Sequence, residues 1–149
     1  MKENIVILIS MIGVMLSSCG IDEETRTEFI IRNNSAYAVE LIVYDAQMPN
    51  QNPKDVTFNL NNNTEISYYY ILEGENGPIN EYPLGATADS AYINFNSNSE
   101  LQIVYRKNDL NPRNILDINS WDEVKESNTY YIYTYTITDE DNMNKDLIL

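Results

Sequence analysis

The sequence predicts an all-β domain, an antiparallel immunoglobulin-like β-sandwich of about seven or eight strands that follows an N-terminal signal helix. Three observations support this fold. Apolar and polar residues alternate with the two-residue period of half-buried strands. These segments are rich in β-branched and aromatic residues, and clusters of Asn, Ser, Gly and Pro separate them. At 149 residues, with 43% hydrophobic and 21% charged residues, the chain fits one globular domain.

The first half of the domain contains four predicted strands. The alternation is clearest where Val39, Leu41 and Val43 occupy every second position. Asn33, Asn34 and Ser35 predict a hairpin turn, because Asn tolerates left-handed backbone angles. Residues 48–53 and 73–78 are predicted loops from their Pro, Gly and Asn content. The strands are expected at Glu28–Asn33, Tyr37–Ala46, Asp55–Leu60 and Glu65–Leu72.

The second half predicts a further hairpin, with strands Ser90–Phe95 and Glu100–Arg106 on either side of residues 96–99. A short apolar segment follows at 115–118. The last predicted strand, Thr129–Thr138, alternates strictly.

Thr138 and the three acidic residues after it predict a capped helical turn, with Thr138 accepting the first free amides and the acids near the positive helix end. A calcium loop is the alternative for Asp139, Asp141 and Asn144. It fits less well, because the fifth and sixth positions of an EF-hand loop would be Met143 and Asn144.

The N-terminus has the arrangement of a secretory signal peptide. In Ile5–Leu16 only Ser10 is polar, and as a helix this stretch would span about 18 Å, short of the ~30 Å hydrocarbon core. The sequence from Leu16 to Cys19, Leu-Ser-Ser-Cys, resembles the lipobox of bacterial lipoproteins. This resemblance implies cleavage before Cys19, a diacylglycerol on its thiol, and acylation of the new amine by a fatty acid such as palmitate. A cleaved soluble protein and a buried cytosolic helix are the alternatives.

The expected organisation is a signal peptide at 1–18, an acidic tether at 19–26 and the β-sandwich domain at 27–149. The tether contains Asp22, Glu23 and Glu24, and short acidic runs are commonly flexible, solvated segments. Acidic residues just after the lipidated cysteine also resemble the surface-export signal of Bacteroidetes lipoproteins. That resemblance implies a lipid-anchored protein of the outer membrane, with exposure at the cell surface as its further implication.

Four stretches of the domain resemble the small β-sandwich lipoproteins of Bacteroidetes. They are IIRNNSAYAVELIVY, ADSAYINFNSNSELQIVYR, NPRNIL and YTYTITDEDNMNK. The resemblance covers most of residues 27–145, and it rests on fold-type patterns, not on catalytic motifs. It implies no enzyme activity and no fixed ligand, and it supplies no site residue beyond the acylated Cys19.

Charge and composition exclude several kinds of function. Nine basic against 23 acidic residues give a net charge of −14, and without a basic cluster the chain is repelled by nucleic acids. The chain has no His and only one Cys, so histidine-dependent triads, Cys/His zinc sites and an intramolecular disulfide cannot form. We expect no metal and no cofactor. A hydrolase based on two carboxylates stays open as an alternative, although no pair stands out.

The tyrosines of the last strand are the candidate ligand-binding residues. Alternation places Tyr131, Tyr133 and Tyr135 on one face and Tyr130 on the other. Together with Trp121 these three rings either form an exposed platform that stacks on sugars or pack in the core with their hydroxyls at its rim. Separately, Asp89, Ser90 and Ala91 match a short Bacteroidetes O-glycosylation pattern, which makes Ser90 a candidate modification site.

These observations predict a lipid-anchored, non-enzymatic protein that binds a glycan or a protein partner at the cell envelope. One alternative is a structural accessory subunit that uses a strand edge to join a larger assembly. A carboxylate-based hydrolase is the remaining alternative.

Overall fold

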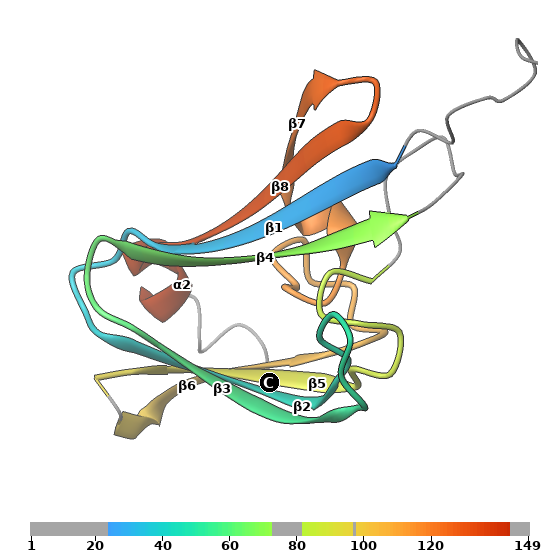
Figure 1. Ribbon diagram of the computed structural model, residues 1–149. Coiled ribbons are helices and arrows are strands. Elements are labelled where there is room, and N and C mark those ends of the chain that lie inside the picture. Colours follow the sequence, from blue (N-terminus) through green and yellow to red (C-terminus); the bar gives the residue numbers. More distant parts are fainter. Residues whose placement is uncertain (1–23, 73–81, 97, 144–149) are drawn as a thin grey trace, which may run out of the picture.

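Two four-stranded sheets pack face to face in the computed structural model, which describes residues 24–72, 82–96 and 98–143 (Figure 1). The predicted signal peptide and Cys19 lie outside the described residues. The elements in chain order are β1 (Thr25–Asn33), β2 (Val39–Ala46), β3 (Lys54–Leu60), β4 (Thr64–Leu72), β5 (Ser90–Phe95), β6 (Asn98–Arg106), the 3₁₀ turn η1 (Ile118–Ser120), β7 (Asp122–Ser127), β8 (Tyr130–Ile137) and the short helix α2 (Asp139–Met143).

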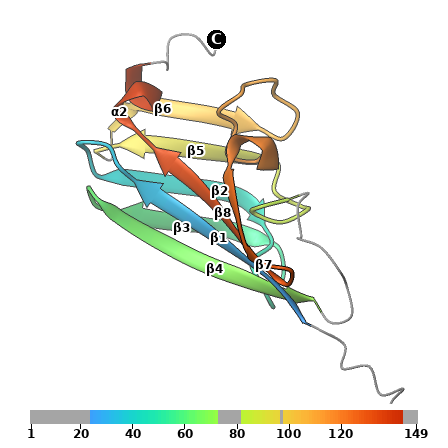
Figure 2. The same ribbon diagram turned by 90° about the horizontal axis from the view of Figure 1, so that it is seen from above.

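The strand order is β4-β1-β8-β7 in one sheet, here sheet A, and β3-β2-β5-β6 in the other, sheet B. The strands of the two sheets cross at an angle when the molecule is seen from above (Figure 2). The β5–β6 hairpin is confirmed, with Ile93 opposite Ile103. The β-sandwich itself is likewise confirmed.

The connections differ from the prediction in two ways. The predicted hairpin at residues 33–35 is wrong, because β1 and β2 belong to different sheets and the turn crosses between them. In addition, β1 pairs with β8 in parallel, so the sandwich is not purely antiparallel. An immunoglobulin constant domain places strands one, two, four and five together, whereas strands one, four, seven and eight share sheet A here. The immunoglobulin-like topology is therefore not confirmed.

No pattern in the sequence predicts β7, and β1 begins earlier than predicted. Every residue of β7 is exposed, so the strand lacks the alternation that marks a half-buried strand. Its charged residues suit an edge strand, because charges on an edge discourage pairing with other chains. β1 begins at Thr25, within the predicted tether of residues 19–26.

The core is centred on Phe29, which is fully buried in β1. Tyr68 of β4 and Tyr133 of β8 lie opposite Phe29 in the sheet register and stack on either side of it, at centroid distances of 5.6 and 5.5 Å. Trp121 and Tyr70 approach the same ring edge-on, at 5.6 and 5.9 Å. We refer to these five residues as the Phe29 cluster.

The acidic segment after β8 is fixed by an ion pair. Arg113 donates from Nε and Nη2 to the two carboxylate oxygens of the buried Asp141, at 3.0 and 2.7 Å, and from Nη2 to the Thr136 carbonyl at 2.6 Å. Asp141 also accepts from the backbone N–H of Thr138 at 2.8 Å. The helical turn is thus confirmed. The cap has the opposite direction to the prediction. The carboxylate of Asp141, the third residue of the helix, accepts a hydrogen bond from the N–H of Thr138, the residue before the helix.

Asn33, at the end of β1, joins the two sheets. Its buried side chain donates from Nδ2 to the carbonyls of Tyr37, Leu60 and Asn61, at 2.8, 3.2 and 3.0 Å. Its Oδ1 accepts from the N–H and the hydroxyl of Ser35, at 3.0 and 2.7 Å. The Asn33 side-chain amide therefore supplies hydrogen-bond partners both to the turn that crosses between the sheets after β1 and to the end of β3.

We predict that Asn33→Ala destabilises the fold by about 3 kcal/mol or more, because it leaves several buried polar groups without a partner. The matched control is Asn59→Ala, at an exposed position of β3, where a change within about 0.5 kcal/mol is expected. Urea denaturation of both variants measures the difference. Equal stability of the two variants would contradict the role given to Asn33.

Candidate functional site

The aromatic residues that the sequence offered as a ligand-binding face lie in the core. Trp121, Tyr131, Tyr133 and Tyr135 are 6, 7, 3 and 0% exposed. The predicted alternation of β8 is correct, and its tyrosine row is the buried face of the strand. Tyr133 lies opposite the buried Phe29 of β1 in the register, so the two strands share this core-facing side. Of the two interpretations of these rings, the structure agrees with packing in the core. They form no exposed stacking platform.

Burial also determines how these tyrosines ionise. Desolvation raises the pKa of Tyr133 to about 12, and Glu123 nearby adds to the effect. Desolvation raises the pKa of Tyr135 as well, and its hydroxyl donates to the Arg113 carbonyl at 2.6 Å. The Trp121 indole N–H donates to the Ile115 carbonyl at 3.0 Å. These polar tips are already engaged within the protein.

The other two candidate site residues have different positions. Cys19 lies outside the described residues. Ser90 is half-buried at the first position of β5, and its hydroxyl donates to the Asp89 carboxylate at 2.7 Å. O-glycosylation of Ser90 stays a prediction.

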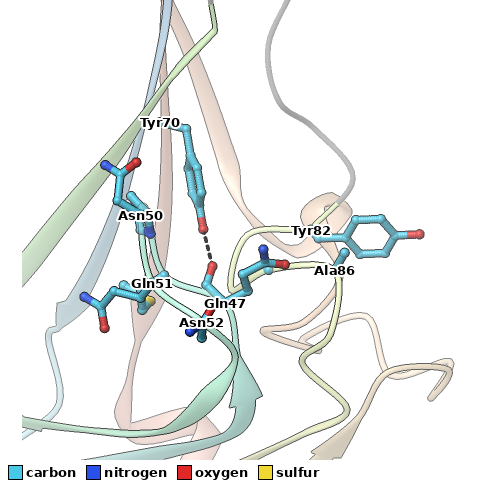
Figure 3. A pocket seen from close by; sticks show the side chains of 10 residues that line it. Gln47, Asn50, Gln51, Asn52, Tyr70, Tyr82 and Ala86 are labelled. Atoms are coloured by element: carbon cyan, nitrogen blue, oxygen red, sulfur yellow. Dashed lines mark hydrogen bonds between the residues drawn. The ribbon is translucent and has the colours of Figure 1, made fainter.

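A pocket of about 510 Å³ lies at one end of the sandwich, between the loop that follows β2 and the described part of the segment that precedes β5 (Figure 3). Its size falls within the range of small-molecule sites. The lining residues are Gln47, Met48, Pro49, Asn50, Gln51, Asn52, Tyr70, Tyr82, Gly85 and Ala86. We refer to this site as the loop pocket.

Tyr70 forms the wall of the loop pocket that is continuous with the core. Its side chain points inward from β4 and packs edge-on against Phe29, while its hydroxyl donates to the Gln47 carbonyl at 2.7 Å. Desolvation raises the pKa of this hydroxyl to about 12, so it is a neutral donor at physiological pH. In Figure 3 the Asn50 and Gln51 amides lie on one side of Tyr70 and the Gln47 amide on the other.

The loop pocket is held in shape by backbone contacts between its two segments. The Gln47 N–H donates to the Leu84 carbonyl at 3.1 Å, and the Thr87 hydroxyl donates to the Asp45 carbonyl at 2.6 Å. Gly85, with φ of +97°, packs so closely that a Cβ atom there would lie 2.5 Å from Cβ of Gln47. Only glycine fits this position.

Tyr82 stands at the rim of the loop pocket and is 37% exposed. Its ring extends away from the other labelled side chains in Figure 3. The Lys107 ammonium lies 4.4 Å from the ring centroid and also donates to the Ala86 carbonyl. Lys107 thus stabilises the position of the segment before β5.

The chemistry of the loop pocket is neutral and polar. Four of its ten lining residues carry a side-chain amide, two are tyrosines, and none is Asp, Glu, Lys or Arg. A two-carboxylate mechanism has no residues to use in this pocket. Across residues 24–72, 82–96 and 98–143, no group of three or more Asp, Glu or Cys side chains is placed to hold a metal ion. Within the same ranges no helix is both long and apolar enough to cross a bilayer.

Comparison with known protein families, with curated proteins and with solved structures finds no match to this chain.

Sequence reasoning identified residues 48–53 as a loop but not as part of a binding site. Asn and Gln in a loop are ordinary turn composition. The sign that was available is the density of amides between residues 47 and 52, where four of six residues are Asn or Gln. Which of the three consecutive tyrosines in β4 meets the loop depends on long-range pairing of β4 with β1, which periodicity does not reveal.

We predict that stability falls as the pH rises from about 10 to about 12, because Tyr70 and Tyr133 have a pKa near 12 when folded and about 10 when unfolded. The stabilisation is complete below pH 10, and it is lost as the folded tyrosines ionise. Urea denaturation at several pH values measures this loss. Tyr133→Phe removes one of these groups and should flatten the decline, whereas an identical profile in that variant would contradict the assignment.

We predict that Gly85→Ala destabilises the protein by about 2 kcal/mol or more, because the new Cβ would collide with Gln47 and the positive φ disfavours alanine. Ala86→Ser, at the adjacent exposed position, is the control and should leave stability within about 0.5 kcal/mol. Urea denaturation, with limited proteolysis of the 47–52 loop, compares the two. Wild-type behaviour of Gly85→Ala would show that the close approach is not required.

Proposed function

We propose that this protein is a lipid-anchored, non-enzymatic binding protein of the bacterial cell envelope, held at the outer membrane by acyl chains on Cys19 and exposed at the cell surface. The ligand, a glycan or part of a partner protein, is taken up in the loop pocket. The observation that carries the binding role is the composition of that pocket, which offers amides and tyrosine rings but no ionised side chain.

The anchor is supported by the residues before and after Cys19. A short apolar segment followed by Leu-Ser-Ser-Cys supplies the leader and the acylation site, and the acidic residues after Cys19 resemble an export signal. Two or three acyl chains exceed what stable anchoring needs, at about 0.8 kcal/mol for each buried methylene. The resemblance to small β-sandwich lipoproteins of Bacteroidetes agrees with this localisation.

A structural accessory subunit is the second candidate, and the edge of sheet A favours it. The edge strand β4 is nine residues long and has one charged side chain, Glu65. Edge strands are commonly protected by charges or proline, and an unprotected edge can accept an added strand. The opposite edge strand of the sheet, β7, is by contrast highly charged.

The anchoring is tested by expressing the full chain in a Gram-negative host as wild type and as Cys19→Ser. We expect wild type in the membrane fraction, with a mass that shows acylation and an N-terminus at Cys19, and Cys19→Ser as an unacylated precursor. Ser18→Ala, which keeps a small residue before the cysteine, is the matched control and should behave as wild type. Normal processing and retention of Cys19→Ser would disprove the anchor.

The same membranes, extracted in mild detergent, separate the two candidate roles. A monomer on size-exclusion chromatography supports a binding protein that acts alone. A discrete large complex supports the accessory role.

A further inference from the structure

We infer that the loop pocket binds a neutral saccharide, an inference that rests on the proposed binding role and names its ligand class. Its lining has no basic side chain to hold an anion.

The charge distribution favours a neutral ligand. None of the lining residues is Asp, Glu, Lys or Arg, and Lys107, which contacts two of them, is engaged by the Tyr82 ring and the Ala86 carbonyl. The chain as a whole has a net charge of −14, which repels anions such as phosphates, uronates and sulfates. Without a carboxylate in the lining, a cationic ligand has no partner either.

The polar groups suit an array of hydroxyls. A sugar hydroxyl both donates and accepts hydrogen bonds, and a side-chain amide offers an oxygen acceptor and two N–H donors. Gln47, Asn50, Gln51 and Asn52 are all exposed, so their amides meet solvent or ligand. Adjacent hydroxyls on one sugar ring can each find an amide partner in such a set.

The apolar component comes from Tyr70 and Met48, which line the same pocket. The C–H face of a sugar ring packs on aromatic surface, and ligand sites combine such a surface with a few oriented polar groups. Tyr70 is held by Phe29 behind it and by its hydrogen bond to Gln47. Its ring therefore does not have to be ordered when the ligand binds, which lowers the entropic cost of binding.

The loop itself is also pre-shaped. Asn50 has φ of +59°, a conformation that Asn tolerates, and the Gln51 N–H donates to the Met48 carbonyl at 3.1 Å. The tight turn fixes the backbone of Asn50 and Gln51 and the direction in which each side chain leaves it. These starting positions relative to Tyr70 are therefore set by the fold before any ligand binds.

The test uses the acylated full chain, purified in mild detergent, on an array of neutral hexose and N-acetylhexosamine oligosaccharides together with uronate-containing and sulfated ones. We expect binding to a subset of the neutral sugars, and titration calorimetry with the strongest of these gives the affinity. Gln51→Ala should weaken binding about tenfold, the effect of one lost hydrogen bond of about 1.4 kcal/mol. Asn50→Gly, which removes the amide and keeps the backbone angle, should have a comparable effect.

Two controls separate the loop pocket from the rest of the surface. Asn59→Ala removes an exposed amide from β3, and Tyr69→Ala removes the exposed ring next to Tyr70 on the opposite face of β4. Both should bind within about twofold of wild type.

Each contrary result has a definite meaning. Binding to none of the saccharides, a preference for the anionic sugars or for a peptide, or equal loss in Asn59→Ala and Gln51→Ala overturns the neutral-saccharide site. Saccharide binding by a protein that is not acylated in cells leaves the inference standing and overturns the anchor. Hydrolysis of the bound sugar overturns the non-enzymatic role alone.

Discussion

The stacking of aromatic rings on Phe29 is the contact on which the sandwich depends. Tyr68, Phe29 and Tyr133 form one continuous stack across three strands of sheet A, and Trp121 closes it from the segment before β7. With a single cysteine the chain has no internal disulfide to hold its layers, so this burial of aromatic surface must supply much of the stability. Burying these tyrosines does not leave their hydroxyls without partners. The Tyr68 hydroxyl, for example, donates to the Pro83 carbonyl at 2.8 Å.

Tyr70 connects this core to the loop pocket. One part of its ring packs on Phe29 and its hydroxyl holds the 47–52 loop, so the pocket wall inherits the rigidity of the sheet. Its neighbour Tyr69 points to the opposite face, where the Arg26 guanidinium lies 4.4 Å from its ring centroid. The alternation of a strand thus gives two adjacent tyrosines unrelated environments. The amide side chains of the 47–52 loop are exposed, so substitutions there can alter the site without disturbing the core.

Local patterns predicted most of the strands but not how they are assembled. Alternation marked a buried face correctly in β8, where every second residue is in the core, and in β2 from Val39 to Val43, before the register shifts between Val43 and Ala46. It did not show that the turn after Asn33 crosses between sheets, because that turn is fixed by bonds to Leu60 and Asn61, far along the chain. β7 was missed since neither of its faces is buried. The loop pocket could not be predicted, because it exists only where β4, the 47–52 loop and Gly85 meet.

The pairing of the first strand with the last has a kinetic consequence. Arg26 lies opposite Tyr130 in the register, so the centre of sheet A cannot form until nearly the whole domain has been synthesised. Contacts so distant along the chain slow folding, since a large loop must close before they repay its entropy. For a polypeptide that is threaded through a translocon before it matures, as proposed here, this delay is useful. On this proposal, the nascent chain would stay export-competent, and the sandwich would close only after translocation.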